Sequence, residues 1–232
     1  MKTIGLIGGM SWESSAVYYQ LLNQQVREQL GGQQSCACLL YSVDFAEIAE
    51  LQHQNRWDLL SLRMVEAAQR LEFGGADLIV LCTNTMHKLA ETIEQSIKVP
   101  FVHIVDATGD AVRQRSCHKV GLLGTKFTME EPFFKDRLQH RFSVETLIPT
   151  EADRAVIHRV IYEELVQGVI QDASRQQYVQ IMKRLVAVGA EGIILGCTEI
   201  GLLITQADCS VPIFDTTHLH ARSAVGLALS TI

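Results

Sequence analysis

The sequence predicts an α/β protein with two pseudo-symmetric lobes, each built on a doubly wound parallel sheet. Short runs rich in Ile, Leu and Val alternate with longer segments of helical periodicity, which is the pattern of strand–helix repeats around a buried parallel sheet. In addition, motifs of the first half recur in the same order in the second half. In such a fold the active site is expected at the carboxyl ends of the strands, in the cleft between the lobes.

The expected strands are short apolar runs that end at polar or turn-forming residues. In chain order they are residues 3–8, 37–43, 77–82, 101–105, 119–124, 144–147, 192–196 and 211–214. Two intervening helices carry apolar residues at three- and four-residue steps, namely Trp57, Leu60, Met64, Ala67 and Leu71 in the first and Tyr178, Ile181, Leu185 and Val188 in the second. Such stripes predict helix faces that pack on a core rather than a cofactor site.

The repeat within the chain consists of three pairs of motifs. They are separated by 116, 114 and 112 residues, respectively: GLIG at 5–8 and GLLG at 121–124, GADLIVL at 75–81 and GAEGIIL at 189–195, VP at 99–100 and VP at 211–212. Three matches in the same order indicate duplicated α/β units related by a pseudo-two-fold axis.

The length, composition and net charge of the chain indicate which kinds of molecule it binds. The chain has 232 residues, of which 47% are hydrophobic, so that it is long enough to bury a sizeable core. Its formal net charge is −6 and it has no Lys/Arg run, which argues against a nucleic-acid or anionic-membrane surface and favours small solutes. No apolar stretch approaches the roughly 18 residues of a spanning helix, so a cytoplasmic protein is expected. The six cysteines lack metal-motif spacing, and free thiols are expected.

Reactive side chains follow two of the expected strands. At the 114-residue shift, Thr83 aligns with Cys197, which predicts one reactive group from each lobe on opposite sides of a ligand. Two groups on opposite faces of one carbon can remove a proton on one side and return one on the other, which inverts a stereocentre without a cofactor. A thiol, with its pKa of about 8.5, suits this task, whereas a Thr hydroxyl is too weak an acid to serve as the base unaided. Strand alternation predicts that Cys82 points away.

These motifs carry a resemblance to a known family. The segments CTNTMHK and GCTEIGLL, with IGLIGGMSWESS at the start and GLLGTKFTM in the second half, resemble the aspartate/glutamate racemases over essentially the whole chain. The resemblance implies a cofactor-independent amino-acid racemase with a cleft site, no metal, and one thiol per lobe. It implies a first lobe of residues 1–105, a second lobe of 106–212, and a final segment, 213–232, that packs back on the first lobe. Members often pair as dimers, so a homodimer is expected.

The resemblance also assigns roles residue by residue. Cys197 takes the place of the thiol that serves the L-enantiomer, and Thr83 stands where the thiol that serves the D-enantiomer is usual. Positions that hold the substrate's amino and α-carboxylate groups match Asn84, Thr85, Thr125 and Thr198. Gly8, Gly9 and Met10 match the loop that closes the site, and Glu199 is placed among the substrate-binding residues.

The substrate is less sharply defined. Relatives grip the distal carboxylate of aspartate with basic side chains, but the comparable stretches here, residues 43–45 and 162–164, are not basic. Gln52 is a candidate polar contact, and a helix N-terminus could take the carboxylate instead. Aspartate and glutamate are the favoured substrates, with a broader amino-acid preference as the alternative. A non-catalytic protein that binds a dicarboxylate on the same scaffold is the rival from another class.

Several other residues admit two interpretations. Glu199, Glu163 and Glu164 could act as bases, but capping a helix or facing solvent is the simpler expectation. His87 could tune the charge of the site or be structural, and Cys82 could swing in to restore a thiol pair. The spacings Cys36-x-Cys38 and His218-x-His220 invite a metal site, but two helical residues that lie two positions apart do not share a face.

Overall fold

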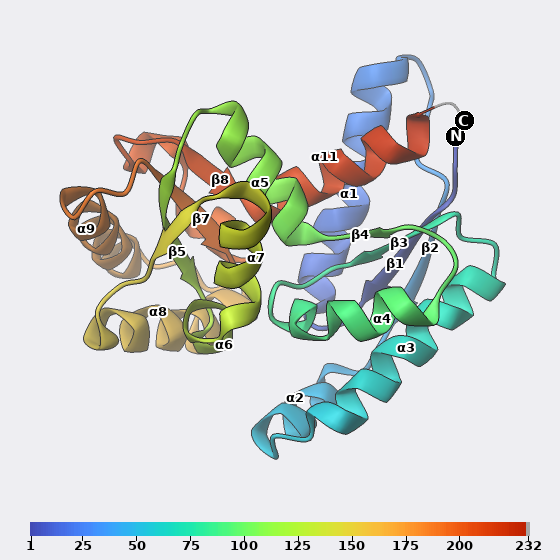
Figure 1. Ribbon diagram of the computed structural model, residues 1–232, viewed down its shortest axis with the longest axis horizontal. Helices are drawn as coiled ribbons and strands as arrows, with labels where there is room; N and C mark the ends of the chain where they lie inside the picture. The colour runs from blue at the N-terminus through green and yellow to red at the C-terminus, as the bar shows by residue number, and fades with distance from the viewer. Residues whose placement is uncertain (231–232) are drawn as a thin grey trace. The chain divides into compact units, whose positions relative to one another are not determined.

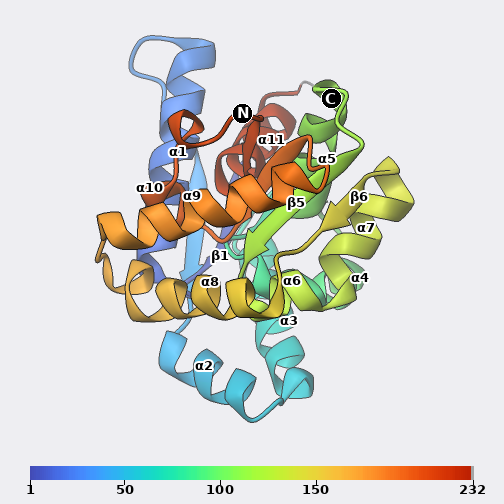
Figure 2. The same cartoon turned by 90° about the vertical axis from the view of Figure 1, so that its left-hand side faces the viewer.

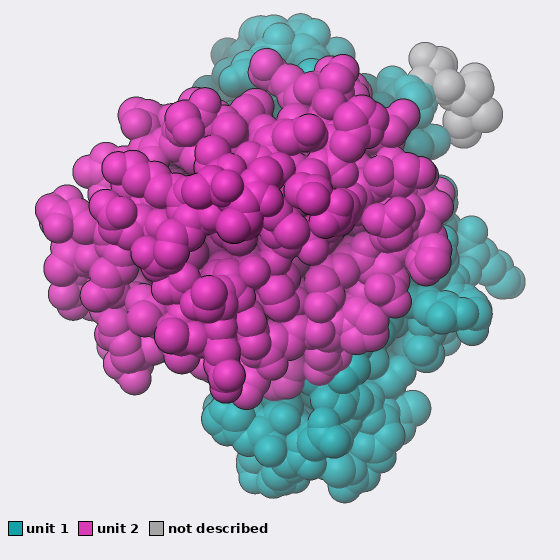
Figure 3. All heavy atoms as spheres, turned by 60° about the vertical axis from the view of Figure 1, so that its left-hand side comes forward, with its two compact units in different colours: residues 1–103, 220–232 teal, residues 104–219 magenta. Residues whose placement is uncertain are grey.

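The computed structural model describes residues 1–230, which form two compact α/β units (Figure 3). Unit 1 comprises residues 1–103 together with the C-terminal segment from residue 220, and unit 2 is Ile104–Leu219. The chain therefore leaves unit 1 after His103 and returns to it at His220, within the last helix. Among the described residues, no helix combines the length and apolar character needed to cross a bilayer.

Unit 1 is a parallel sheet with helices on both faces (Figure 1). Its strands, in the spatial order β2-β1-β3-β4, are β1 (Ile4–Gly8), β2 (Cys38–Ser42), β3 (Leu78–Leu81) and β4 (Phe101–Val102). Its helices are α1 (Trp12–Leu30), α2 (Phe45–His53), α3 (Trp57–Phe73), the 3-10 helix η1 (Thr85–Leu89) and α4 (Ala90–Ser96). Ile4 and Leu6 pack under α1 and the last helix, α11 (Thr216–Leu229), while Ile7 packs under α3 and α4. Alternate residues of a strand thus serve two separate cores.

Unit 2 repeats this arrangement with the strand order β6-β5-β7-β8. The strands are β5 (Lys119–Gly124), β6 (Glu145–Leu147), β7 (Gly192–Gly196) and β8 (Ile213–Asp215). The helices are α5 (Ile104–Gln114), α6 (Lys126–Glu130), α7 (Pro132–Phe142), α8 (Glu151–Glu163), η2 (Leu165–Gln167), α9 (Asp172–Ala187), α10 (Ile200–Leu203) and η3 (Gln206–Asp208), followed by the start of α11. Helices α8 and α9, seen side by side in Figure 2, cover one face of the sheet, and α5 and α7 cover the other.

Strand registers confirm the internal repeat. In unit 1, Gly5 pairs with Ile79, and in unit 2 Gly121 pairs with Ile193, so that the shifts of 116 and 114 residues describe the same ladder position. Likewise, Ile79 pairs with Phe101 and Ile193 with Ile213, which carries the 112-residue shift to the fourth strand of each sheet. The matching strand order and register identify each residue at a strand end with a counterpart in the other unit.

The expected strands are confirmed with one correction. The expected strand at residues 101–105 is wrong in its second half, because β4 is only Phe101–Val102 and α5 begins at Ile104. Ile104 and Val105 are buried, but they are buried in the first turn of a helix, where Thr108 Oγ1 donates to the Ile104 carbonyl at 2.8 Å. A short apolar run fits a buried strand and a buried helix equally well, and here helical packing decides.

Candidate active site

The reactive segment of unit 2 begins directly after β7. Cys197 Sγ donates a hydrogen bond to Oε2 of Glu199 at 3.0 Å, and Thr198 Oγ1 donates to the same oxygen at 2.6 Å. Cys197 and Glu199 are 9% and 6% exposed, so that this contact is largely shielded from water. The strand end therefore holds a thiol and a hydroxyl that share one carboxylate oxygen within hydrogen-bonding distance.

The charges around Cys197 favour its protonated form. Burial, with the carboxylates of Glu199 and Asp215 adding to it, raises the pKa of the Cys197 thiol well above its usual value. Asp215 ends β8, where its carboxylate accepts the backbone N–H groups of Thr217 at 2.9 Å and His218 at 3.2 Å, and burial raises its pKa. Sequence reasoning did not select Asp215, whose position is fixed by the pairing of β8 with β7.

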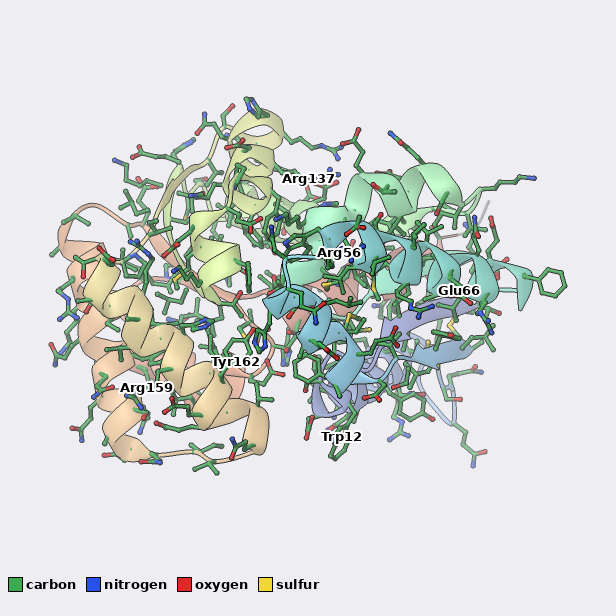
Figure 4. All side chains as sticks on the ribbon, turned by 90° about the horizontal axis from the view of Figure 1, so that it is seen from below. Trp12, Arg56, Glu66, Arg137, Arg159 and Tyr162 are labelled. Carbon is green, nitrogen blue, oxygen red and sulfur yellow. The ribbon has the colours of Figure 1, made fainter. Side chains whose placement is uncertain are left out.

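Tyr162 of unit 2 lies near this segment and His158 lies beside Tyr162, and neither was predicted as a site residue. Tyr162, on α8 (Figure 4), has its pKa raised to about 12 by burial and by the nearby Cys197 and Glu199. The ring of His158 lies 4.6 Å from that of Tyr162, and His158 Nδ1 accepts the backbone N–H of Lys126 at 3.2 Å. The spacing of four residues between the two rings is ordinary for a helix face, so the sequence alone carried no signal.

Thr125 starts the same region at the end of β5. Its hydroxyl caps α6 by accepting the Thr128 N–H at 3.3 Å, and it lies 3.2 Å from the Thr128 hydroxyl. Thr125 is 7% exposed. The residues matched by resemblance in unit 2, Thr125, Thr198 and Glu199, therefore all follow the carboxyl ends of the two central strands, β5 and β7.

The two other glutamates considered as bases are engaged elsewhere. Glu163 has a 68% exposed side chain whose ion pair with Arg159 is 3.9 Å long. Glu164, by contrast, neither faces solvent nor is free, because its carboxylate accepts from Ser174 Oγ at 2.6 Å and from Arg159 at 3.4 Å. The expectation of a solvent-facing or capping side chain is therefore wrong for Glu164, which stabilises the packing between α8 and α9.

The reactive segment of unit 1 follows β3. Thr83 is half-buried, whereas Asn84 and Thr85 are buried at 3% and 7% exposure. His87 Nδ1 lies 2.6 Å from the Thr83 carbonyl oxygen, and because a carbonyl only accepts, this nitrogen carries the proton. The ring of His103 lies 4.7 Å from that of His87. His87 thus holds the backbone of the strand end.

Cys82 is separated from this segment by strand alternation. It is 1% exposed and belongs to the apolar cluster that contains Leu78 and Val80. Burial raises the pKa of the Cys82 thiol well above its usual value. Cys82 thus packs in an apolar cluster, which is consistent with the expectation that it points away from the reactive segment.

The loop after β1 has a defined conformation. Gly9 has φ +90°, and a Cβ at this position would overlap the backbone of Val43. The Gly9 N–H donates to Ser15 Oγ at 2.9 Å. Met10, which follows, is half-buried against the apolar cluster under α3, and Gln52 on α2 donates to the Met86 sulfur at 3.3 Å. Met10 and Gln52 therefore both belong to unit 1.

Symmetry-related positions of the two units carry different chemistry. By the register shifts, Thr83 corresponds to Cys197, Thr85 to Glu199, and His103 to Asp215. Unit 2 thus presents a thiol with two carboxylates, and unit 1 presents hydroxyls with an imidazole. The fold is duplicated but the acid–base groups are not.

Comparison with known proteins agrees with this fold. The sequence profile of the Asp/Glu/Hydantoin racemase family matches residues 7–224, and the chain belongs to that family. The protein is accordingly an isomerase of the racemase type.

Individual relatives cover most or all of the chain. The crystal structure of a proposed Asp/Glu racemase from Yersinia pestis is 48% identical, with a TM-score of 0.94 over 99% of this chain and 100% of that one. An aspartate racemase homologue from Pyrococcus horikoshii is 35% identical, with a TM-score of 0.88 over the same shares of the two chains. The broad specificity amino-acid racemase RacX of Bacillus subtilis is 25% identical over 180 residues, which are 75% of this chain and 74% of that protein.

Proposed function

We propose that the protein inverts the α-carbon of aspartate and glutamate, with Cys197 as the base that removes the α-proton of the L-enantiomer. The observation that carries this proposal is the buried Cys197 thiol at the end of β7, in a chain of the racemase family. A thiolate can take an α-proton when the substrate's ammonium and carboxylate groups are held in place. Asn84, Thr85, Thr125 and Thr198 are proposed to hold those groups, with Met10 and Gln52 bordering the substrate.

Thr83 is proposed to act on the opposite face of the α-carbon. Its hydroxyl, or a water molecule that it holds, returns a proton to the carbanion, because a Thr hydroxyl is too weak an acid to act as a resting base. Racemisation has an equilibrium constant of one, so kcat/KM must be equal in the two directions. The inequality between Cys197 and Thr83 therefore shows itself as exchange of the α-proton without inversion.

The range of amino acids accepted is a separate question. Similarity to the broad specificity amino-acid racemase of Bacillus subtilis favours a wider substrate set as the second candidate. The half-buried, neutral Tyr162 near Cys197 also differs from the cationic group that a distal carboxylate prefers.

Chiral chromatography tests the proposed function. Purified protein is incubated with L-aspartate, L-glutamate and the neutral L-homoserine, and the D-enantiomer is measured over time, with Cys197→Ser as the control. The proposal expects D-aspartate or D-glutamate to form only when Cys197 is present. Conversion of homoserine at an equal rate would show that the enzyme has broad specificity. Binding of aspartate without any conversion would show that the protein is a non-catalytic binding protein. Two further predictions are that the protein forms a homodimer and that it is located in the cytoplasm. Light scattering tests the first of them.

A further inference from the structure

The contact between Cys197 and Glu199 is unusual because the thiol faces a carboxylate, whose negative charge disfavours a thiolate, rather than a cation that would stabilise one. The Sγ–Oε2 distance of 3.0 Å is short for a bond to sulfur, and the Thr198 hydroxyl, 2.6 Å from the same oxygen, fixes the orientation of the carboxylate. Both Cys197 and Glu199 are more than nine-tenths buried. The Glu199 carboxylate thus accepts the thiol proton of Cys197, which has to leave before Cys197 can act as a base.

Among the described residues, the further titratable groups coupled to Cys197 are a carboxyl group and two phenols rather than cations. Asp215 on β8 adds a second negative charge. Tyr162 on α8 and Tyr178 on α9 are phenols whose pKa values are raised by burial and by Cys197, so both are neutral at physiological pH. A thiol in these surroundings stays protonated in the free protein. A thiolate therefore requires a proton acceptor that is already in contact with it.

We propose that Glu199 is this acceptor: when an L-amino acid binds, Glu199 takes the proton of Cys197 and leaves the thiolate that attacks the α-proton. This inference rests on the proposed function and deepens it. The S–H bond breaks, its electron pair stays on sulfur, and an O–H bond forms on Glu199, so that the pair keeps a net charge of −1. The thiolate then takes the α-hydrogen as a proton, and the C–H electron pair remains on the α-carbon.

The internal repeat supports a functional link between the two side chains. Cys197 and Glu199 occur together in unit 2, whereas the corresponding positions of unit 1 are Thr83 and Thr85. A hydroxyl that only donates a proton has no need of an acceptor two residues later. The expectation that the Glu199 side chain caps a helix or faces solvent is wrong, because it makes no capping hydrogen bond to α10 and is 6% exposed.

Glu199→Gln tests this role because it keeps the shape of the side chain and removes its acid–base function. Two quantities are measured: kcat and KM for α-proton exchange of L-aspartate in D2O, and the rate at which iodoacetamide alkylates Cys197, resolved from the other five cysteines by peptide mass spectrometry. We expect kcat to fall about 100-fold or more with KM little changed, as for loss of an acid–base group. Alkylation at pH 7 should become faster, because a negative charge next to the thiol is lost.

Glu163→Gln is the matched control. It also removes one carboxylate from unit 2, but from a side chain that is 68% exposed and paired only loosely with Arg159, so both quantities should stay at wild-type values. Should Glu199→Gln fail to fold, Glu199→Asp retains the acid at a shorter reach, and its kcat should fall by less than 100-fold.

The alternatives predict different results. A rise in KM with unchanged kcat in Glu199→Gln would make Glu199 a substrate-binding residue and overturn the proposal, as would wild-type kcat with unchanged alkylation. Failure of the proposed function looks different: the wild-type protein would then exchange no α-proton of any amino acid, with or without Glu199.

Discussion

The phenol oxygen of Tyr18 lies 2.9 Å from Nδ1 of His220, although the two residues are 202 positions apart in the chain. His220 Nε2 lies 2.7 Å from the Val102 carbonyl oxygen and must be the donor there, so Nδ1 is the acceptor and the Tyr18 hydroxyl donates to it. His220 is fully buried. This pair ties the C-terminal helix to α1 and β4 within unit 1, and it requires a neutral imidazole.

Stability should therefore fall in mildly acidic solution. Burial lowers the pKa of His220 to about 4, against about 6.5 in an unfolded chain. Between these pH values the unfolded chain binds more protons, so the contribution of His220 is complete above pH 6.5 and is lost as the pH falls towards 4, by about 3 kcal/mol in all. Urea unfolding at several pH values should show this loss for the wild-type protein and a flatter profile for His220→Gln. Parallel profiles would contradict the assignment.

The buried Glu164 predicts a purely structural effect. Ser174→Ala removes the 2.6 Å hydrogen bond to Glu164 and leaves that carboxylate with Arg159 at 3.4 Å, so the free energy of unfolding should fall by about 1–3 kcal/mol. The exposed Ser35→Ala should change it by less than about 0.5 kcal/mol. Racemase activity of both variants should match the wild type at a temperature where they are folded. A selective loss of activity in Ser174→Ala would instead place Glu164 in the reaction.

Two glycines with positive φ, Gly31 and Gly9, allow the energetic cost of backbone strain to be compared with that of steric overlap. Gly31→Ala meets nothing within 4 Å at φ +74°, so it should cost about 1–2 kcal/mol of unfolding free energy. Gly9→Ala, at φ +90°, also drives its Cβ into the backbone of Val43 and should cost at least about 2 kcal/mol more. Chemical denaturation of the two variants measures the difference. Equal losses would mean that the loop after β1 shifts freely to make room.

The asymmetry between the units can be altered directly. Thr83→Cys places a thiol opposite Cys197 in the proposed reaction, so more of each exchange event should end in inversion. The expected result is a higher ratio of D-enantiomer formed to α-proton exchanged, starting from L-aspartate. Cys82→Ala is the control and should leave this ratio unchanged, since Cys82 packs in the apolar cluster with Leu78 and Val80. A changed ratio of D-enantiomer formed to α-proton exchanged in Cys82→Ala would indicate that the Cys82 thiol takes part in the reaction.

The sequence predicted the backbone better than the side-chain partners. Buried apolar runs such as residues 119–124 and 192–196 are strands with unchanged bounds, because only a parallel sheet buries them on both faces. The repeat correctly aligned Thr83 with Cys197. The contact of Glu199 with Cys197 is local, since the two residues lie two positions apart in the turn after β7. The burial of Glu164 and the approach of Asp215 and Tyr162 to Cys197 depend on packing between elements. Tertiary packing, which one-dimensional patterns do not record, decides these contacts.

The most direct test of the unequal acid–base groups is proton NMR in D2O of L-aspartate and D-aspartate in separate incubations, with D- and L-enantiomers quantified in the same samples. The account predicts that the α-proton of L-aspartate is lost at least tenfold faster than that of D-aspartate, that this loss needs Cys197, and that it exceeds the rate of inversion. Equal initial rates of deuterium entry into the two enantiomers would contradict it, because Thr83 would then serve as a base equal to the thiolate.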